Sequence, residues 1–172
     1  MISSITTIRD NYRLIRQQLS KETLLNASRG VVEFLDHALP KGEKIGLFLS
    51  LDELPGELDL SELSLRLGPL AYSSRVVSFK RREMEFYHVL SGERLRDISE
   101  LKIILVPGVV FDLAGHRFGS GYGFYDRALA ESPNIEKWGI THSIGLYTQG
   151  ELPTEPWDVK MNRVVTEHGF AL

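Results

Sequence analysis

The segment from Val106 to Leu129 contains the residue types of a phosphate-binding loop. An apolar stretch leads to Arg117, glycines follow at positions 119, 121 and 123, and an Asp-Arg pair stands at positions 126 and 127. Glycine permits backbone conformations in which several N–H groups approach one anion, and arginine side chains supply countercharge. We therefore expect this segment to bind the phosphates of a nucleotide triphosphate.

Two common nucleotide-binding motifs do not fit this segment. Its glycine spacing differs from the dinucleotide-binding fingerprint, and no Gly-Lys-Ser or Gly-Lys-Thr follows that would make a P-loop. A plain glycine-rich turn between a strand and a helix is the alternative. The presence of Arg117 and Asp126 beside the glycines favours the phosphate site.

The elements expected around this loop are helices and strands in alternation. Apolar residues at spacings of three and four predict a helix from Ile5 to Leu19, and Ser20 separates it from a second helix that begins near Lys21 and ends before Pro40. Strands are expected at 44–51, 75–80, 85–89, 102–106, 138–146 and 163–166, and short helices at 61–67 and 124–130. This order predicts a single α/β domain over residues 1–172, with a mostly parallel sheet flanked by helices in three layers. Ligands of such sheets bind beyond the carboxyl ends of the strands, so segments 52–57 and 115–126 are expected to face one pocket.

Composition limits the classes of partner. A chain of 172 residues with 42% hydrophobic residues has the size of one domain with a buried core. The formal net charge of −3 argues against nucleic acid as a partner, and the absence of cysteine excludes disulfides and thiol nucleophiles. The first residues lack the basic and apolar blocks of a targeting signal, and Pro107-Gly108 interrupts the apolar run from 103 to 110. We expect a cytoplasmic monomer that binds small molecules and no membrane.

A family resemblance follows from the motifs in chain order. The central motif consists of Pro107-Gly108, Phe111-Asp112, Gly115, Arg117-Phe118-Gly119, Gly121, Gly123 and Phe124-Tyr125-Asp126-Arg127. Further blocks are Phe48-Leu49-Ser50, Gly56-Glu57-Leu58-Asp59, Ile144-Gly145-Leu146, Leu152-Pro153, Trp157-Asp158-Val159 and Val164-Val165-Thr166-Glu167. Together these residues resemble the 5-formyltetrahydrofolate cyclo-ligase (5,10-methenyltetrahydrofolate synthetase) family, and the likeness covers most of the chain.

The resemblance implies an activity and its cofactors. It implies ring closure of 5-formyltetrahydrofolate to 5,10-methenyltetrahydrofolate with ATP and Mg²⁺. ATP would phosphorylate the formyl oxygen, a neighbouring folate nitrogen would attack the activated carbon, and phosphate would leave. The protein would contribute positioning and electrostatic stabilisation.

The resemblance also implies roles for individual residues. Arg9, Arg117 and the loop residues Gly119, Ser120, Gly121, Tyr122 and Gly123 would bind ATP, with Phe124 and Tyr125 forming part of the wall between the nucleotide and the folate. Asp126 and Asp158 would hold Mg²⁺, since this ion takes one or two carboxylates together with phosphate oxygens and waters. Glu57 and Tyr125 would contact the folate, and Arg117 and Asp126 would carry catalysis.

Each of these residues also has a plain structural interpretation. Asp126 would favour the first turn of a helix without any metal, Glu57 could be a solvated turn residue, and Asp158 could cap the segment that follows it. Arg9, Arg13 and Arg16 form a charged stripe typical of a solvated helix face, and only Arg9 and Arg16 fit the family pattern. Positions 80–82 are expected to form an exposed turn. The five histidines lack metal-ligand spacing, and only His116 falls in the loop.

Four departures from the family pattern leave other functions open. Ile5 stands where a phosphate-binding lysine is usual, Tyr122 replaces a glycine or lysine, the Gly-Ile-x-Glu-Pro segment is absent, and the stretch after Leu146 is short. A non-catalytic nucleotide- or folate-binding relative is the main alternative. A ligase that acts on another formylated or amide substrate is the second. The surviving Asp126 and Asp158 favour an enzyme over a non-catalytic relative.

Overall fold

Two helices open the chain in this computed structural model, which describes residues 5–49 and 56–172. The helix α1 spans Ile5–Gln17 and α2 spans Lys21–Ala38, as the apolar spacing predicted. Ser20 lies between the two helices and is the N-cap of α2, because its hydroxyl accepts a hydrogen bond from the Thr23 backbone N–H at 3.0 Å.

The central sheet has seven strands, and the five inner ones are parallel. Its order is β10-β9-β7-β4-β1-β2-β3, with antiparallel pairing only at the two edges. The bounds are β1 Ile45–Leu47, β2 Ala71–Ser78, β3 Glu83–His88, β4 Ile103–Pro107, β7 Glu136–Ile140, β9 Arg163–Thr166 and β10 Gly169–Phe170. The predicted mostly parallel sheet is confirmed.

Shorter elements lie around this sheet. A second sheet consists of β5 Val110–Asp112 between β6 Arg117–Phe118 and β8 Leu146–Tyr147. The helix α3 spans Ser61–Leu67 and α4 spans Phe124–Ala130, both as predicted. Three single 3₁₀ turns, η1 Gly68–Leu70, η2 Ile98–Glu100 and η3 Ser143–Gly145, connect the longer elements.

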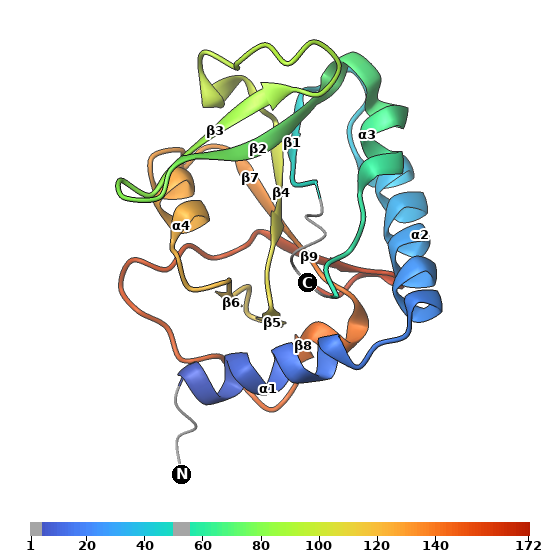
Figure 1. The fold of residues 1–172 in the computed structure, drawn as a ribbon, viewed down its shortest axis with the longest axis vertical. Coiled ribbons are helices and arrows are strands. Elements are labelled where there is room, and N and C mark those ends of the chain that lie inside the picture. Colours follow the sequence, from blue (N-terminus) through green and yellow to red (C-terminus); the bar gives the residue numbers. More distant parts are fainter. Residues whose placement is uncertain (1–4, 50–55) are drawn as a thin grey trace.

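The helices cover both faces of the sheet and its carboxyl end. Figure 1 shows α2 and α3 on one side of the strands, α4 on the other, and α1 lying across the end where β4 and β7 finish. The core is divided accordingly: one cluster packs α2 and α3 against β1, and another packs α4 against β4 and β9. A third, smaller cluster joins Ile8 of α1 to Val110, Phe118 and Leu152. The predicted α/β layers are therefore present, and α1 covers the carboxyl edge where a ligand site is expected.

Most strand predictions had wrong ends, and β3, for example, spans Glu83–His88 where 85–89 was predicted. β1 stops at Leu47, and positions 50–51 of the predicted strand lie outside the described residues. β2 begins at Ala71, four residues early, because its first residues pair in parallel with β1. β7 ends at Ile140, where the chain leaves the sheet and turns through η3 toward β8. A Cβ at Gly145 would collide with the Thr141 hydroxyl, so this turn needs glycine.

None of the described helices is long and apolar enough to cross a membrane.

Candidate active site

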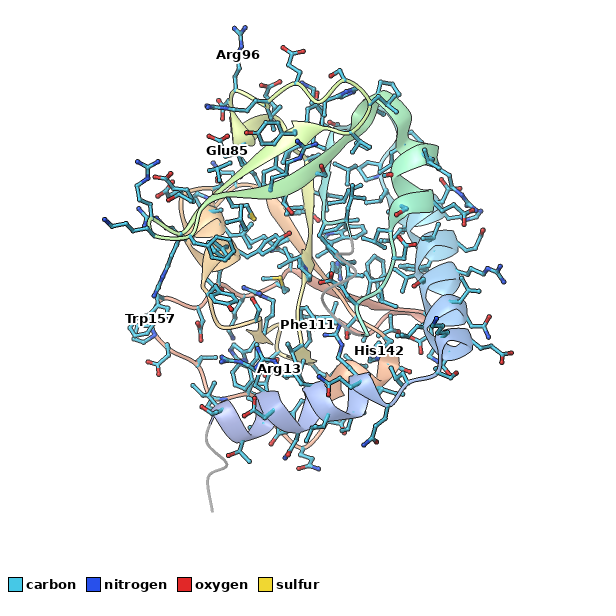
Figure 2. All side chains as sticks on the ribbon, in the orientation of Figure 1. Arg13, Glu85, Arg96, Phe111, His142 and Trp157 are labelled. Atoms are coloured by element: carbon cyan, nitrogen blue, oxygen red, sulfur yellow. The ribbon has the colours of Figure 1, made fainter. Side chains whose placement is uncertain are left out.

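Residues 119–123, hereafter the glycine loop, lie against arginines from two elements. Arg13 of α1 donates from Nη2 to the Ser120 carbonyl at 2.8 Å, and Figure 2 shows its side chain on the side of α1 that faces β5 and β6. A Cβ at Gly121 would lie 3.1 Å from Nη1 of Arg9, and one at Gly119 only 2.6 Å from Nη1 of Arg117. Glycine is therefore needed for the guanidinium groups to approach the loop backbone this closely.

Arg117 and Asp126, both predicted catalytic residues, form a partly buried ion pair. Nη2 of Arg117 lies 2.8 Å from Oδ1 of Asp126, with 4% and 23% of the two side chains exposed. Nη1 of Arg117 donates to the Pro107 carbonyl at 3.2 Å. The structure thus fixes Arg117 between the end of β4 and the first turn of α4.

Two donors beside the glycine loop have no partner in the described part of the chain. They are the buried Nε atoms of Arg9 and Arg117. A buried N–H without an acceptor is energetically costly, so an anion that satisfies both would be stabilised there. The predicted phosphate site therefore has both the cradle and the unsatisfied donors that an anion requires.

Arg16 connects the loop after β1 to the loop after β4. It donates from Nε and Nη2 to the Gly56 carbonyl at 3.0 and 2.7 Å, and from Nη1 to the Gly108 carbonyl at 2.8 Å. Burial lowers the pKa of Arg16, and the negative charge of Glu57 acts in the opposite direction. Arg16 is therefore an engaged, half-buried residue, and the interpretation of the α1 arginine stripe as a solvated face is wrong for it.

Tyr125 lies beside Arg117, the predicted phosphate residue. Its hydroxyl is 2.8 Å from the Ser74 hydroxyl, and the Arg117 guanidinium lies 5.8 Å from its ring centroid. Burial raises its pKa, the charge of Glu57 raises it further, and Arg117 lowers it. Arg16 binds the Gly56 carbonyl and Arg13 binds the Ser120 carbonyl, so segments 56–57 and 117–126 both lie at the edge of the sheet that α1 covers. Segments 52–57 and 115–126 were expected to face one pocket, and positions 52–55 of the first segment lie outside the described residues.

Asp112 fixes the turn that precedes the glycine loop. Its fully buried carboxylate accepts hydrogen bonds from the backbone N–H groups of Ala114, His116 and Leu152 at 2.9, 2.8 and 2.7 Å, and from Nδ1 of His116 at 2.8 Å. Burial alone would raise the pKa of Asp112, but these hydrogen bonds give a net lowering. His116, the histidine inside the predicted loop, therefore holds the turn together.

The same turn holds both ends of the loop that carries Asp158. Leu152 is bound by Asp112, and the Met161 N–H donates to the Gly115 carbonyl at 2.8 Å. Gly115 has φ +89°, and a Cβ there would lie 2.5 Å from the Met161 carbonyl oxygen. The Asp112 turn thus sets the positions of the glycine loop and of loop 152–161 together.

Asp158 closes a small turn within loop 152–161. Its Oδ2 accepts at 2.8 Å from the N–H of Glu155, which precedes Asp158, whereas the capping interpretation expected a partner in the segment after it. Trp157 beside it is 68% exposed at the outer edge of the molecule (Figure 2). Within the described ranges no three His, Asp or Glu residues are grouped as a metal site. Asp126 and Asp158 as metal ligands stay a prediction.

His142 is a buried polar residue at this edge that the sequence did not single out. It follows β7, is 3% exposed, and neither ring nitrogen has a partner within the described residues. The pKa of His142 is lowered to about 4. Burial is the main cause, the nearby charge of Arg16 acts in the same direction, and the charge of Glu167 acts in the opposite direction. His142 is therefore neutral at pH 7. Its neighbourhood with Arg16 arises from the fold, and no sequence spacing points to it.

An aromatic cluster covers the other side of the glycine loop. Phe124 is 8% exposed, and its ring centroid lies 5.2 Å from that of Phe79 and 5.8 Å from that of Tyr122. Phe79 comes from the turn between β2 and β3, which is exposed as predicted. Nη1 of Arg127 donates to the Arg81 carbonyl at 2.7 Å and fastens this turn to α4.

On α1, the sequence analysis did not identify Arg13 as a site residue. The signal for it was present, because Arg9, Arg13 and Arg16 recur at helical spacing and so share one face. Nothing in the sequence showed that this face lies against the glycine loop.

Comparisons with known proteins agree with this geometry. A sequence model described as the 5-formyltetrahydrofolate cyclo-ligase family matches residues 71–167. The 5-formyltetrahydrofolate cyclo-ligase of Escherichia coli K12 is 32% identical over 142 residues, which cover 71% of this chain and 76% of the relative. The mouse protein of the same name is 22% identical over 151 residues, 73% of each chain.

Two solved structures share the fold. The 5,10-methenyltetrahydrofolate synthetase of Aquifex aeolicus has a TM-score of 0.80 at 28% identity over 96% of this chain and 91% of its own. The corresponding protein of Mycoplasma pneumoniae has a TM-score of 0.81 at 21% identity over 96% and 99%. The predicted fold class is confirmed.

Proposed function

Because this chain belongs to the 5-formyltetrahydrofolate cyclo-ligase family, we propose that it catalyses the ATP- and Mg²⁺-dependent conversion of 5-formyltetrahydrofolate to 5,10-methenyltetrahydrofolate. One observation supports this most: α1 joins the two expected ligand segments, because Arg16 binds the Gly56 carbonyl next to Glu57 and Arg13 binds the Ser120 carbonyl of the glycine loop. The relatives reported above are all named as enzymes. The comparisons therefore do not favour a non-catalytic relative.

The phosphates of ATP are assigned to the glycine loop. The unsatisfied Nε groups of Arg9 and Arg117 would donate to phosphate oxygens. Backbone N–H groups of the loop residues would add further donors around the same anion. The set assigned to ATP is Arg9, Arg117, Gly119, Ser120, Gly121, Tyr122, Gly123, Phe124 and Tyr125.

Mg²⁺ is assigned to Asp126 and Asp158. The Arg117 contact uses Oδ1 of Asp126, and the Glu155 contact uses Oδ2 of Asp158, so each carboxylate has a second oxygen for a ligand. A site of one or two carboxylates completed by phosphate oxygens and waters suits Mg²⁺. Bound there, the ion would offset the charge of the phosphates.

The folate is assigned to Glu57 and Tyr125. The Glu57 carboxylate can accept hydrogen bonds from the amino and ring N–H groups of a pterin, and the Tyr125 ring separates this side from Arg117. Arg16 holds the Gly56 carbonyl and so fixes the backbone next to Glu57.

The proposed reaction is a phosphoryl transfer followed by a ring closure. The formyl oxygen attacks the γ-phosphorus of ATP and ADP leaves. The neighbouring folate nitrogen then attacks the formyl carbon, the carbon–oxygen bond breaks, and phosphate departs while the nitrogen loses its proton. Arg117 would stabilise the negative charge on the transferring phosphoryl group, and the loop would hold that group in line with the formyl oxygen.

A direct assay tests the proposal. Purified protein is mixed with 5-formyltetrahydrofolate, ATP and Mg²⁺, and the methenyl product is followed by absorbance, with mixtures lacking ATP or Mg²⁺ as controls. We expect product only in the complete mixture. ATP binding without product under any condition would refute the proposed activity. Free phosphate released with another formylated or amide substrate in place of the folate would indicate the second alternative, a different ligase.

Glu57→Gln tests the folate assignment separately. We expect a higher KM for the folate with an unchanged KM for ATP. The amide of glutamine has one acceptor oxygen and no charge, whereas the carboxylate has two acceptor oxygens and a negative charge. Glu62→Gln in α3, a half-exposed residue away from this edge, is the matched control. We further propose that the enzyme is a cytoplasmic monomer, which gel filtration and cell fractionation can check.

A further inference from the structure

A cavity of about 450 Å³ lies between the start of α2 and the segments that follow β7 and β9. We call it the α2 cavity. Its volume is that of a small-molecule site, and none of its lining residues belongs to the sets assigned above to ATP, Mg²⁺ and folate. Leu19 lines it just beyond the end of α1, whereas Arg9 of the phosphate site lies about 12 Å before that end.

His142 lines the α2 cavity and has no hydrogen-bond partner among the described residues. Figure 2 shows it between the ends of the strands and the start of α2. The residue is 3% exposed, and both Nδ1 and Nε2 are buried and unpaired. A neutral imidazole has one N–H donor and one acceptor nitrogen. Because buried polar groups without partners are costly, a ligand that bonds to this ring would be stabilised.

Glu167 places a negative charge at the same cavity. Its Oε2 accepts from the Ser143 backbone N–H at 2.7 Å and its Oε1 from the Ser143 hydroxyl at 2.6 Å, which leaves each oxygen able to accept again. Burial raises the pKa of Glu167, but the hydrogen bonds from Ser143 give a net lowering, so this carboxylate is ionised at neutral pH. Gly30 lets α2 pass this closely, since a Cβ there would lie 2.9 Å from the Cβ of Glu167.

The rest of the cavity suits a flat organic group. Apolar side chains line much of it, namely Leu19, Leu24, Ala27 and Ile144. His168 at the rim has a side chain that is 76% exposed, and with His142 and Glu167 it forms no metal-binding group in the part of the chain that the structure describes. The lining therefore fits an organic ligand better than a metal ion.

We propose that the α2 cavity is a second ligand site, for a small aromatic ring that carries amine or amidine N–H groups. The ring packs between Leu24 and Ile144. Its N–H groups donate to the acceptor nitrogen of His142 and to the Glu167 carboxylate. An anionic ligand is disfavoured, because the charge of Glu167 repels it. This site is separate from the proposed reaction and does not depend on it.

Benzamidine is the probe, and benzoate, which has a similar shape and the opposite charge, is the comparison. Binding is followed by NMR of the nitrogen-labelled full chain. We expect benzamidine to bind with a Kd of about 1 mM and to shift the signals of His142, Ile144 and Glu167, and we expect no binding of benzoate. An excess of ATP and 5-formyltetrahydrofolate should leave the Kd of benzamidine unchanged.

Three variants and one control test the contacts. Glu167→Gln removes the charge and should raise the Kd of benzamidine about tenfold, and His142→Phe keeps a ring without an acceptor and should raise it about fivefold. Leu24→Ala keeps every polar group and should raise it about threefold, so the proposal stays testable if a polar variant does not fold. Leu25→Ala is the matched control, because Leu25 is 51% exposed and is not part of the described lining, and its Kd should be that of the wild type.

Several results would overturn the proposal. No signal shift at these residues with benzamidine at about 20 mM would show that the cavity is only a packing gap. Equal binding of benzoate and benzamidine would refute the ligand class, and displacement of benzamidine by ATP or the folate would place the probe in the catalytic site. A wild type that binds benzamidine at His142 but makes no methenyl product would support this site and contradict only the proposed function.

Discussion

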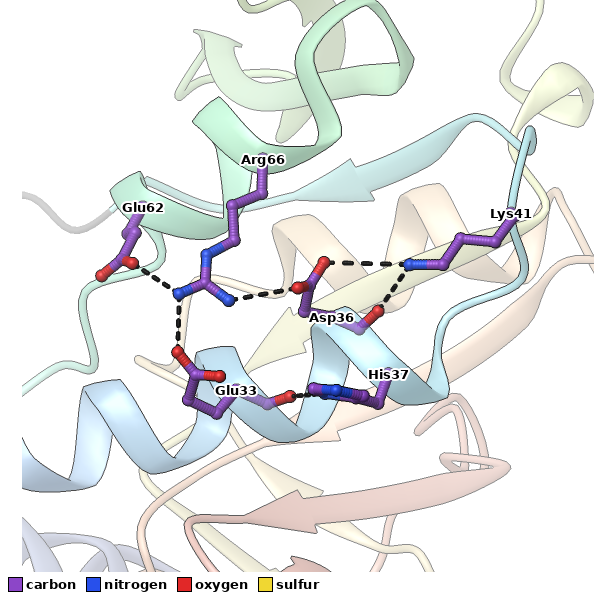
Figure 3. A network of polar contacts seen from close by, with 6 residues as sticks. All are labelled: Glu33, Asp36, His37, Lys41, Glu62 and Arg66. Atoms are coloured by element: carbon purple, nitrogen blue, oxygen red, sulfur yellow. Dashed lines mark hydrogen bonds and ion pairs between the residues drawn. The ribbon is translucent and has the colours of Figure 1, made fainter.

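Two regions of this molecule, the network around Arg66 and the glycine loop, differ in how many arginine N–H groups have an acceptor. Arg66 of α3 contacts three carboxylates, with Nη2 at 2.6 Å from Glu33 and 2.6 Å from Glu62, and Nη1 at 3.1 Å from Asp36 (Figure 3). These hydrogen bonds raise the pKa of Arg66. Lys41 completes the network through the Asp36 carbonyl at 2.8 Å.

At the glycine loop, the buried Arg117 and the partly buried Arg9 are incompletely partnered. Arg117 is 4% exposed at its side chain and contacts one carboxylate, while its Nε and that of Arg9 have no acceptor in the described structure. Arg66, a surface arginine with three carboxylate partners, links α3 to α2. A buried cation with a donor left over is suited to a ligand, because the ligand removes the cost of that unsatisfied group.

Replacement of Arg117 should have the largest effect. Arg117→Gln removes the cation nearest the proposed phosphoryl transfer, and we expect kcat/KM to fall by about 10²–10³-fold. The variant also breaks the partly buried ion pair with Asp126, so we expect a lower Tm as well. Steady-state kinetics with a thermal melt measures both. Activity within threefold of wild type would place Arg117 outside the reaction.

Asp126→Asn should come next. The amide keeps the size of the side chain but loses the charge that would hold Mg²⁺, so we expect about a 10²-fold loss of turnover and a higher Mg²⁺ requirement. Asp36→Asn, in the Arg66 network, is the control and should keep full activity. An Asp126→Asn enzyme with the Mg²⁺ dependence of wild type would show that the metal ligand is misassigned.

Arg9→Gln should weaken ATP binding without stopping the reaction. One unsatisfied donor and one charge are lost, so we expect KM for ATP to rise about tenfold while kcat changes less than threefold. Titration with tripolyphosphate, which has no base, should show the same ratio. An unchanged affinity for both ligands would mean that Arg9 serves only to pack against the Phe118 ring, 5.7 Å away.

His142 offers a pH-dependent contrast to these always-charged residues. Its pKa is about 4 in the fold and 6.5 in an unfolded chain, so the unfolded state binds the proton first as the pH falls. We expect stability to decrease from about pH 6.5 toward pH 4, and His142→Phe to flatten that decrease. Urea unfolding at pH 7.5, 6 and 5 tests it. Parallel curves for the two proteins would show that His142 titrates normally.

Arg66→Gln should have the smallest effect. All its partners are solvent-exposed, so we expect Tm to fall by no more than about 3 °C and the kinetics to stay unchanged. If activity fell as much as is expected for Arg117→Gln, the number of unsatisfied donors on an arginine would not distinguish structural from ligand-binding arginines.

Local sequence patterns predicted most elements, because they reflect short-range physics. Apolar spacing gave α1 and α2, Ser20 gave the start of α2, and the bounds of α3 and α4 were correct. Strand ends were less accurate, since pairing with a distant strand decides them. Ala71 joins β2 only because it lies beside Ile45 of β1.

The candidate site shows the same division. The motif from Arg117 to Asp126 indicated a phosphate loop, and Arg117 and Asp126 do lie 2.8 Å apart. Arg13 and His142 were not found, because Ser120, which Arg13 binds, is 107 residues away, and because the charges that act on the pKa of His142, those of Arg16 and Glu167, come from other segments of the chain.

The sequence by itself determined the chemistry available to this protein: a glycine loop, its arginine and acid, and the family to which they belong. Only the tertiary structure decided which donors are left unsatisfied, that Asp112 fixes two loops at once, and that Phe79 packs on Phe124. Residue types and helical spacing are written locally in the chain. Burial and hydrogen-bond partners depend on segments far apart in sequence, and they exist only after the sheet has brought those segments together.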